Sequence, residues 1–126
     1  MTAGFQATDR TVLRIGGGDA REFLQNLVTN DVRGLDRGPV YAALLSPQGK
    51  YLFDFFLVPD GSDILLDIQT ARAGALAQRL ALYRLRAAVS IEPTELAVLL
   101  GTGAPPATRL AFADPRAEAL GWRAYV

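Results

Sequence analysis

The sequence contains no cysteine and no histidine, and these two absences exclude whole classes of function. Without cysteine, the chain can form no disulfide, thiolate nucleophile, zinc finger or cysteine-bound iron–sulfur cluster of its own. Without histidine, it can carry neither a Ser-His-Asp triad nor an HExxH metal site. Acid–base chemistry would have to come from the 13 acidic residues and the four tyrosines. A metal could be held only by oxygen ligands, and we assign no catalytic residue and no metal ligand.

The chain also lacks an excess of charge of either sign. Thirteen basic residues balance thirteen acidic ones, whereas a duplex-DNA footprint usually needs a clear basic excess. No apolar run is long enough to cross a membrane, and residues 1–20 do not resemble a signal peptide. We therefore expect no nucleic acid and no membrane as partners, and the cytoplasm as the default location.

The composition is that of an ordinary globular protein. Half of the 126 residues are hydrophobic and 21% are charged, so disorder over most of the length is not expected. A chain of this length can bury a core without disulfides or metals. We expect residues 1–126 to form a single domain or the N-terminal fragment of a longer one.

Hydrophobic periodicity predicts the elements. Residues 1–10 show no regular pattern, and a short strand follows at 11–15. Asp19 and Glu22 have capping-box spacing, which predicts a helix beginning at Ala20 and ending near residues 29–31.

The rest of the chain continues this alternation of helix and strand. Three short strands separated by turn residues predict an antiparallel meander, and a long amphipathic helix follows at 71–87. The meander strands are expected at 40–45, 51–58 and 64–68, and later strands at 89–92, 96–100, 109–113 and 121–126. Because helices and strands do not repeat as βαβ units, the predicted class is α+β, an antiparallel meander sheet with two main helices.

Two residues of the meander are candidates for binding. Asp54 lies in the middle of an apolar, aromatic strand, where it either binds a ligand or protects a sheet edge from aggregation. Tyr41 lies one hairpin arm away. It offers a flat ring and a hydroxyl to a heteroaromatic ligand, or it is simply a core tyrosine.

Two further features have a simpler interpretation beside a functional one. Gly16-Gly17-Gly18 precedes a helix and could bind phosphate, but it matches no phosphate-binding motif and is more readily a turn. Arg72, Arg79 and Arg86 recur every seven residues and could meet an anionic ligand or RNA. Such a stripe is more often the solvated face of a helix.

Four segments, in order, resemble one family over about residues 11–126. Asp19–Val32 resembles the opening helix of the folate-binding superfamily of the glycine-cleavage T-protein, an aminomethyltransferase. Tyr41–Asp54 looks like its next signature. Arg79–Val89 and Asp114–Arg123 are similar to one branch, the YgfZ-type proteins and their mitochondrial relatives in iron–sulfur cluster assembly.

The resemblance implies a fold and a ligand site. The YgfZ-type Lys-Gly-Cys motif follows the matched region in longer members and is absent here, so the likeness is to the N-terminal half of a T-protein-like folate-binding domain. Family positions matching Tyr41, Asp54 and, after the third strand, Gln69 imply tetrahydrofolate as the ligand. Phe53 stands where the transferases often carry an acidic residue.

The function implied by this resemblance is accessory. We expect a tetrahydrofolate-binding protein that supports iron–sulfur cluster assembly or repair, with client or assembly proteins as partners and no cluster bound by this chain. One alternative is an aminomethyltransferase that moves a one-carbon unit to tetrahydrofolate, although activity of this chain alone is not expected. Another is a non-catalytic half-domain that only associates with a partner chain. The apolar strand at 121–126 suggests a homodimer, or pairing with a missing second half.

Overall fold

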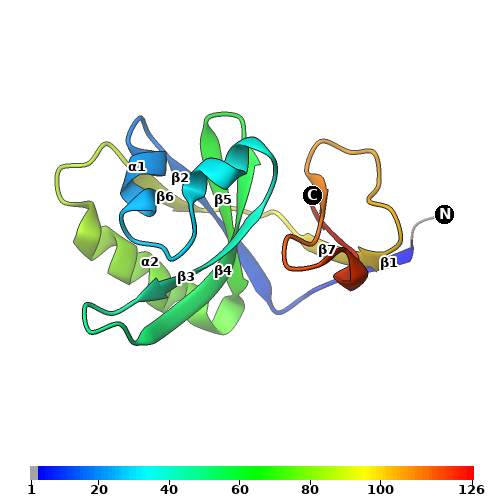
Figure 1. Ribbon diagram of the computed structural model, residues 1–126, viewed down its shortest axis with the longest axis horizontal. Coiled ribbons are helices and arrows are strands. Elements are labelled where there is room, and N and C mark those ends of the chain that lie inside the picture. The colour runs from blue at the N-terminus through cyan, green and yellow to red at the C-terminus, as the bar shows by residue number, and fades with distance from the viewer. Residues whose placement is uncertain (1–2) are drawn as a thin grey trace.

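Two antiparallel β-sheets and two α-helices are formed by residues 3–126, the part of the chain that the computed structural model describes (Figure 1). The strands are β1 (Ala3–Gln6), β2 (Arg10–Gly16), β3 (Val40–Leu45), β4 (Tyr51–Asp60), β5 (Asp63–Gln69), β6 (Ser90–Pro93), β7 (Val98–Thr102), β8 (Ala111–Ala113) and β9 (Trp122–Tyr125). The helices are α1 (Ala20–Gln25) and α2 (Thr70–Arg84), with short 3-10 helices over Val32–Asp36 and Glu118–Leu120. This architecture confirms the predicted α+β class.

The larger sheet contains the predicted meander. Its five strands lie in the order β3-β4-β5-β2-β6, so β3, β4 and β5 are neighbours and β2 pairs with the other edge of β5. Side chains alternate along β4 from Phe53 to Val58, whereas Leu52 packs with Phe53 on the first core because the register shifts there. Phe53, Phe55 and Leu57 enter the core on the helical side, whereas Phe56 and Val58 enter a second core on the opposite side.

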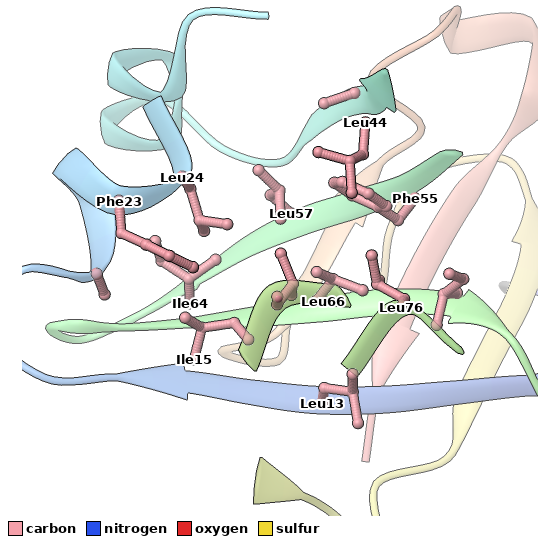
Figure 2. Packing of buried hydrophobic residues seen from close by; sticks show 14 of the residues in the cluster. Leu13, Ile15, Phe23, Leu24, Leu44, Phe55, Leu57, Ile64, Leu66 and Leu76 are labelled. Carbon is pink, nitrogen blue, oxygen red and sulfur yellow. The ribbon is translucent and has the colours of Figure 1, made fainter. Parts of the chain in front are cut away.

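The first core lies between the five-stranded sheet and the helices. Leu24 from α1 and Leu76 from α2 are fully buried there against Phe55 and Leu66 of the sheet. Figure 2 shows these side chains converging from the helices and from β2, β3, β4 and β5. The predicted apolar face of α2 is therefore confirmed, although the helix ends at Arg84 rather than at residue 87.

The start of α1 is as predicted, but the expected capping box is wrong. Asp19 makes no side-chain bond to the helix; its Oδ2 instead accepts a hydrogen bond from the backbone N–H of Ala88 at 2.8 Å. Gly17 also packs closely against Ala88. Its φ is +100°, and a Cβ at this position would lie 2.1 Å from the Ala88 carbonyl oxygen. The glycine run is therefore a packed turn that joins α1 to the chain following α2.

The smaller sheet corrects two expectations. Residues 3–6 form β1, which pairs with β7, whereas no regular structure was predicted for residues 1–10; residues 1–2 lie outside the described part. Trp122 and Tyr125 on β9 are buried, and β9 lies between β7 and β8. The expectation that residues 121–126 expose an apolar edge is therefore wrong, because strands of the same chain pair with both sides of β9.

A second core joins the two sheets. Val12, Phe56 and Leu65 from the five-stranded sheet pack with Val98 and Tyr125 from the smaller one. The smaller sheet therefore covers the sheet face that the helices leave free, at one end of the molecule (Figure 1). Over residues 3–126 no helix is both long and apolar enough to cross a bilayer.

Candidate functional site

The structure brings Tyr41 and Asp54 together on the sheet face that carries the second core. Tyr41 pairs with Phe56 and Ala43 with Asp54 across β3 and β4, so Tyr41 and Asp54 are diagonal neighbours. The Tyr41 hydroxyl donates a hydrogen bond to Asp54 Oδ2 at 2.6 Å. The ring of Tyr41 also lies 4.9 Å from that of Phe56, centroid to centroid. The pair thus combines a carboxylate with a two-ring aromatic surface.

The environment of Tyr41 keeps its hydroxyl protonated. Burial raises the pKa of Tyr41, and the hydrogen bond to Asp54 and the charge of that carboxylate raise it further, to about 12. The phenol is therefore a hydrogen-bond donor throughout the neutral range. The half-buried Asp54 remains open to a further donor, because Oδ1 accepts no side-chain hydrogen bond from the described residues.

The third predicted site residue, Gln69, does not join this pair. It is exposed at the end of β5, immediately before α2, and pairs with Arg10 across the sheet. Strand alternation gives Gln69 the same face as Asp67, yet within residues 3–126 it forms no side-chain hydrogen bond with Tyr41 or Asp54. Its assignment to the site stays a prediction.

Arg116 lies beside the Tyr41–Asp54 pair, and sequence reasoning did not single it out. Its guanidinium lies 5.5 Å from the Tyr41 ring centroid and 5.0 Å from that of Phe56. Asp114 fixes it, accepting bonds from Nε at 3.0 Å and Nη2 at 2.8 Å. Burial alone would raise the pKa of Asp114, but the hydrogen bonds from Arg116 lower it below its ordinary value. In the sequence, Asp114 and Arg116 contributed a turn and part of the family resemblance but no ligand contact.

A hollow opens beside Tyr41. It has a volume of about 440 Å³ and is lined by Asn30, Pro39, Val40, Tyr41, Pro115 and Arg116. A second hollow of about 270 Å³, which contains Arg37, shares Pro39 and Pro115 with it. The first hollow therefore presents an aromatic ring and the Arg116 cation, and the second adds Arg37 beside Asp114, the carboxylate that pairs with Arg116. Such a surface suits a flat heteroaromatic ring with an anionic tail.

A buried ionic network lies beneath the same aromatic surface. Asp67 on β5 is fully buried and accepts bonds from Arg10 Nε, Arg123 Nη2 and the Tyr125 hydroxyl, each at 2.7 Å. The feature of the sequence that marks this network is a charged residue inside an apolar strand, which occurs at Asp67 and again at Arg123. The same signal singled out Asp54, but it does not reveal which charges meet across the fold.

This network positions Phe56. The buried Arg123 guanidinium lies 3.9 Å from the Phe56 ring centroid, so Phe56 is held between Arg123 below and Tyr41 beside it. Burial would lower the pKa of Arg123, but the charges of and hydrogen bonds to Asp67 and Tyr125 together outweigh burial and raise it. Burial raises the pKa of Tyr125, which therefore stays a donor to Asp67.

Within residues 3–126, no group of three or more acidic side chains is close enough together to bind a metal ion.

The fold defines a class of protein. The chain superposes on the aminomethyltransferase T of the glycine cleavage system from Bartonella henselae with a TM-score of 0.69. The match covers 78% of this chain and 28% of that one, at 20% sequence identity. The chain therefore has the T-protein-like fold, as the sequence resemblance implied. No family model matches the sequence.

Within that class, the chain is similar to the mitochondrial iron–sulfur cluster assembly factor IBA57. It is 33% identical to the human protein, with 96% of this chain and 42% of the human protein aligned. The mouse protein is 30% identical over 94% of this chain and 41% of its own length. The chain thus spans less than half the length of these relatives, which fits the expected N-terminal half. The resemblance to the mitochondrial relatives in iron–sulfur cluster assembly is confirmed.

These relatives also correct one expectation. The absence of a signal peptide had suggested the cytoplasm. The relatives from human, mouse and the fungus Pyricularia oryzae are all named as mitochondrial proteins. The cytoplasmic prediction is therefore contradicted, because a default based on missing features carries less weight than three related proteins assigned to the mitochondrion.

Proposed function

We propose that this chain is a tetrahydrofolate-binding accessory protein in iron–sulfur cluster assembly or repair. The observation that carries the proposal is the Tyr41–Asp54 hydrogen bond beside the hollow, at the positions where the resemblance implies folate contacts. The role in cluster assembly is supported by the similarity to IBA57. It is a proposal for a chain that spans less than half of those relatives.

The residues present fit a pterin. A carboxylate such as Asp54 can accept two N–H bonds from an aminopyrimidine edge, and its Oδ1 is available for one of them. Tyr41 and Phe56 offer aromatic surface, and Arg116 adds a cation beside it. When bound, the folate would supply the capacity to carry a one-carbon unit. The residues of this chain would bind and orient it.

The partners follow from what the chain lacks. With no cysteine or histidine, it brings no thiolate or imidazole to an iron–sulfur cluster. We propose that it acts on client or assembly proteins that themselves hold the cluster. Association as a homodimer, or with a second half supplied separately, is part of the same proposal.

Calorimetry with tetrahydrofolate tests the binding site. Wild-type protein should bind weakly but saturably. Asp54→Asn should weaken binding by about 1–3 kcal/mol, because a charge-assisted acceptor is lost. Asp63→Asn is the matched control, since Asp63 is the first residue of β5 and pairs with Arg14 rather than with Tyr41. Equal affinity in Asp54→Asn and wild type would remove Asp54 from the site, and no binding by wild type would overturn the proposal.

The alternative is aminomethyl transfer. Phe53 occupies the position where transferases often carry an acidic residue, and it is buried in the first core with the Arg72 guanidinium 4.5 Å from its ring centroid. It lies on the opposite face of β4 from Asp54, so the position adds no carboxylate beside Tyr41.

We therefore expect no methylene-tetrahydrofolate when the chain is mixed with aminomethylated carrier protein and tetrahydrofolate. The yield should match that of the protein-free mixture, which serves as the control. Turnover above this background would favour the transferase.

A further inference from the structure

Strand β4 carries a β-bulge next to the proposed site. Leu44 pairs with Phe53 but the next residue of β3, Leu45, pairs with Tyr51, so Leu52 has no partner on β3. Bulges interrupt strict alternation and redirect the neighbouring side chain. The Tyr51 side chain therefore does not share the buried face of Phe53, and it is 61% exposed.

Arg72 holds this bulge in place. Its Nη2 donates a hydrogen bond of 2.6 Å to the carbonyl oxygen of Leu52, the residue that the bulge leaves without a strand partner. The same guanidinium covers the Phe53 ring at 4.5 Å. Arg72 lies in the first turn of α2, which begins directly after β5. This arginine of the helical stripe thus makes specific contacts and does not merely face solvent.

Tyr51 lies within the influence of Asp54. Burial raises the pKa of the Tyr51 hydroxyl, and Asp54 raises it further through hydrogen bonding and charge, against a lowering by Arg72. Among the described residues, the Asp54 side chain accepts a hydrogen bond from Tyr41, at Oδ2, and none from Tyr51. The bulge places both Leu52 and Phe53 against the first core, so Tyr51 lies on the opposite face of β4, which is the face of Asp54. Tyr41, Asp54 and Tyr51 therefore share one face of the β3–β4 pair.

We propose that Tyr51 is a second ligand-contacting tyrosine of the Tyr41–Asp54 site, and that Arg72 is the residue that positions it by holding the bulge at Leu52. This inference rests on the proposed folate-binding function. The ligand it fits is a flat, hydrogen-bonding heteroaromatic ring. Tyr41 and Phe56 meet one part of such a ring, and the exposed Tyr51 supplies a further aromatic surface beside the same carboxylate.

Affinity for tetrahydrofolate tests the role of Tyr51. Tyr51→Ala should weaken binding about fivefold, the size of one aromatic contact. Tyr51→Phe, which keeps the ring, should lose less. Arg72→Met should weaken binding as Tyr51→Ala does, and the double variant should be no weaker than either single one, because both changes remove the same contact. Arg79→Met is the matched control, since Arg79 belongs to the same stripe and contacts Tyr83.

A titration of the ligand-free protein separates positioning from mere stability. Tyrosine ionisation is followed at alkaline pH by ultraviolet absorbance, with Tyr51→Phe identifying the Tyr51 step. Arg72→Met should raise the pKa of Tyr51, because the cation that lowers it is gone. Arg79→Met should leave the pKa unchanged.

The outcomes are distinguishable. No binding by wild type overturns the proposed function and this inference with it. Binding by wild type and equally by Tyr51→Ala overturns this inference alone. If Arg72→Met matches Arg79→Met in both affinity and titration, Arg72 does not position Tyr51.

Discussion

The Tyr41 hydroxyl has a raised pKa because it is partly buried and hydrogen-bonded to Asp54. Its pKa is about 12 in the folded chain against about 10 in an unfolded one, so the folded state holds this proton more tightly. The stabilisation is fully present below pH ~10 and is lost as the pH rises through the folded pKa. Tyr41 thus makes the stability of the site depend on pH in the alkaline range.

We therefore predict that wild-type protein loses stability between about pH 10 and pH 12, and that Tyr41→Phe loses less over the same window. Urea unfolding at several pH values measures both. Tyr125 is retained in both proteins, so its own titration cancels in the comparison. Parallel pH profiles would show that the Tyr41–Asp54 bond does not contribute to stability.

At this scale the sequence predicts some site residues and cannot predict others. Asp54 and Tyr41 stood out because a charge inside an apolar strand and a tyrosine on the neighbouring strand are local patterns. Asp67 shows the same local pattern, but its partner Arg123 lies 56 residues away, so only the folded chain pairs them. Gln69 was placed by resemblance alone.

Among the elements, the two sheets are joined by a buried ionic network as well as by the second core. Asp67 in β5 receives Arg123 and Tyr125 from β9, across the second core. Asp67→Asn should destabilise the fold by about 3–5 kcal/mol, because it leaves a buried guanidinium without its counter-charge. Urea unfolding gives the value, with the more exposed Asp63→Asn as control. A loss below 1 kcal/mol would mean that packing alone joins the sheets.

Most elements were predictable because their signals are local. The meander strands alternate and are separated by turns that contain Gly49 and Gly61, and α2 repeats its apolar residues at helical spacing. β1 was missed because it is short, and its stability comes from pairing with β7 far along the chain. Its Gly4 carries no strand signal, yet a Cβ there would lie 2.8 Å from the Trp122 ring, so glycine is required. Asp19 was misassigned because Ala88, its true partner, is also distant in sequence.

For the whole molecule, the position of β9 changes where association is expected. β9 is internal, whereas β1 is an edge of the four-stranded sheet among the described residues and exposes 66% of Phe5. An apolar residue on an unpaired edge strand promotes pairing with another chain. If the protein associates as proposed, the contact should therefore involve β1.

Light scattering at micromolar concentration should then give a mass above 13.5 kDa, and Phe5→Lys should return it to the monomer value. Leu82→Lys is the control, because Leu82 is similarly exposed, at 69%, but lies on α2. A wild-type monomer that is unchanged on dilution would contradict the association.

The placement of β9 also sets an order in time. A ribosome delivers the strands of the five-stranded sheet, ending with β6, before it delivers β7, β8 and β9. During synthesis, the sheet face carrying Phe56 and Asp67 lacks part of its cover until residues 122–125 emerge and pair between β7 and β8. The nascent chain thus passes through a stage in which its helical half can be folded while its ligand-site face is still partly exposed to solvent and to chaperones.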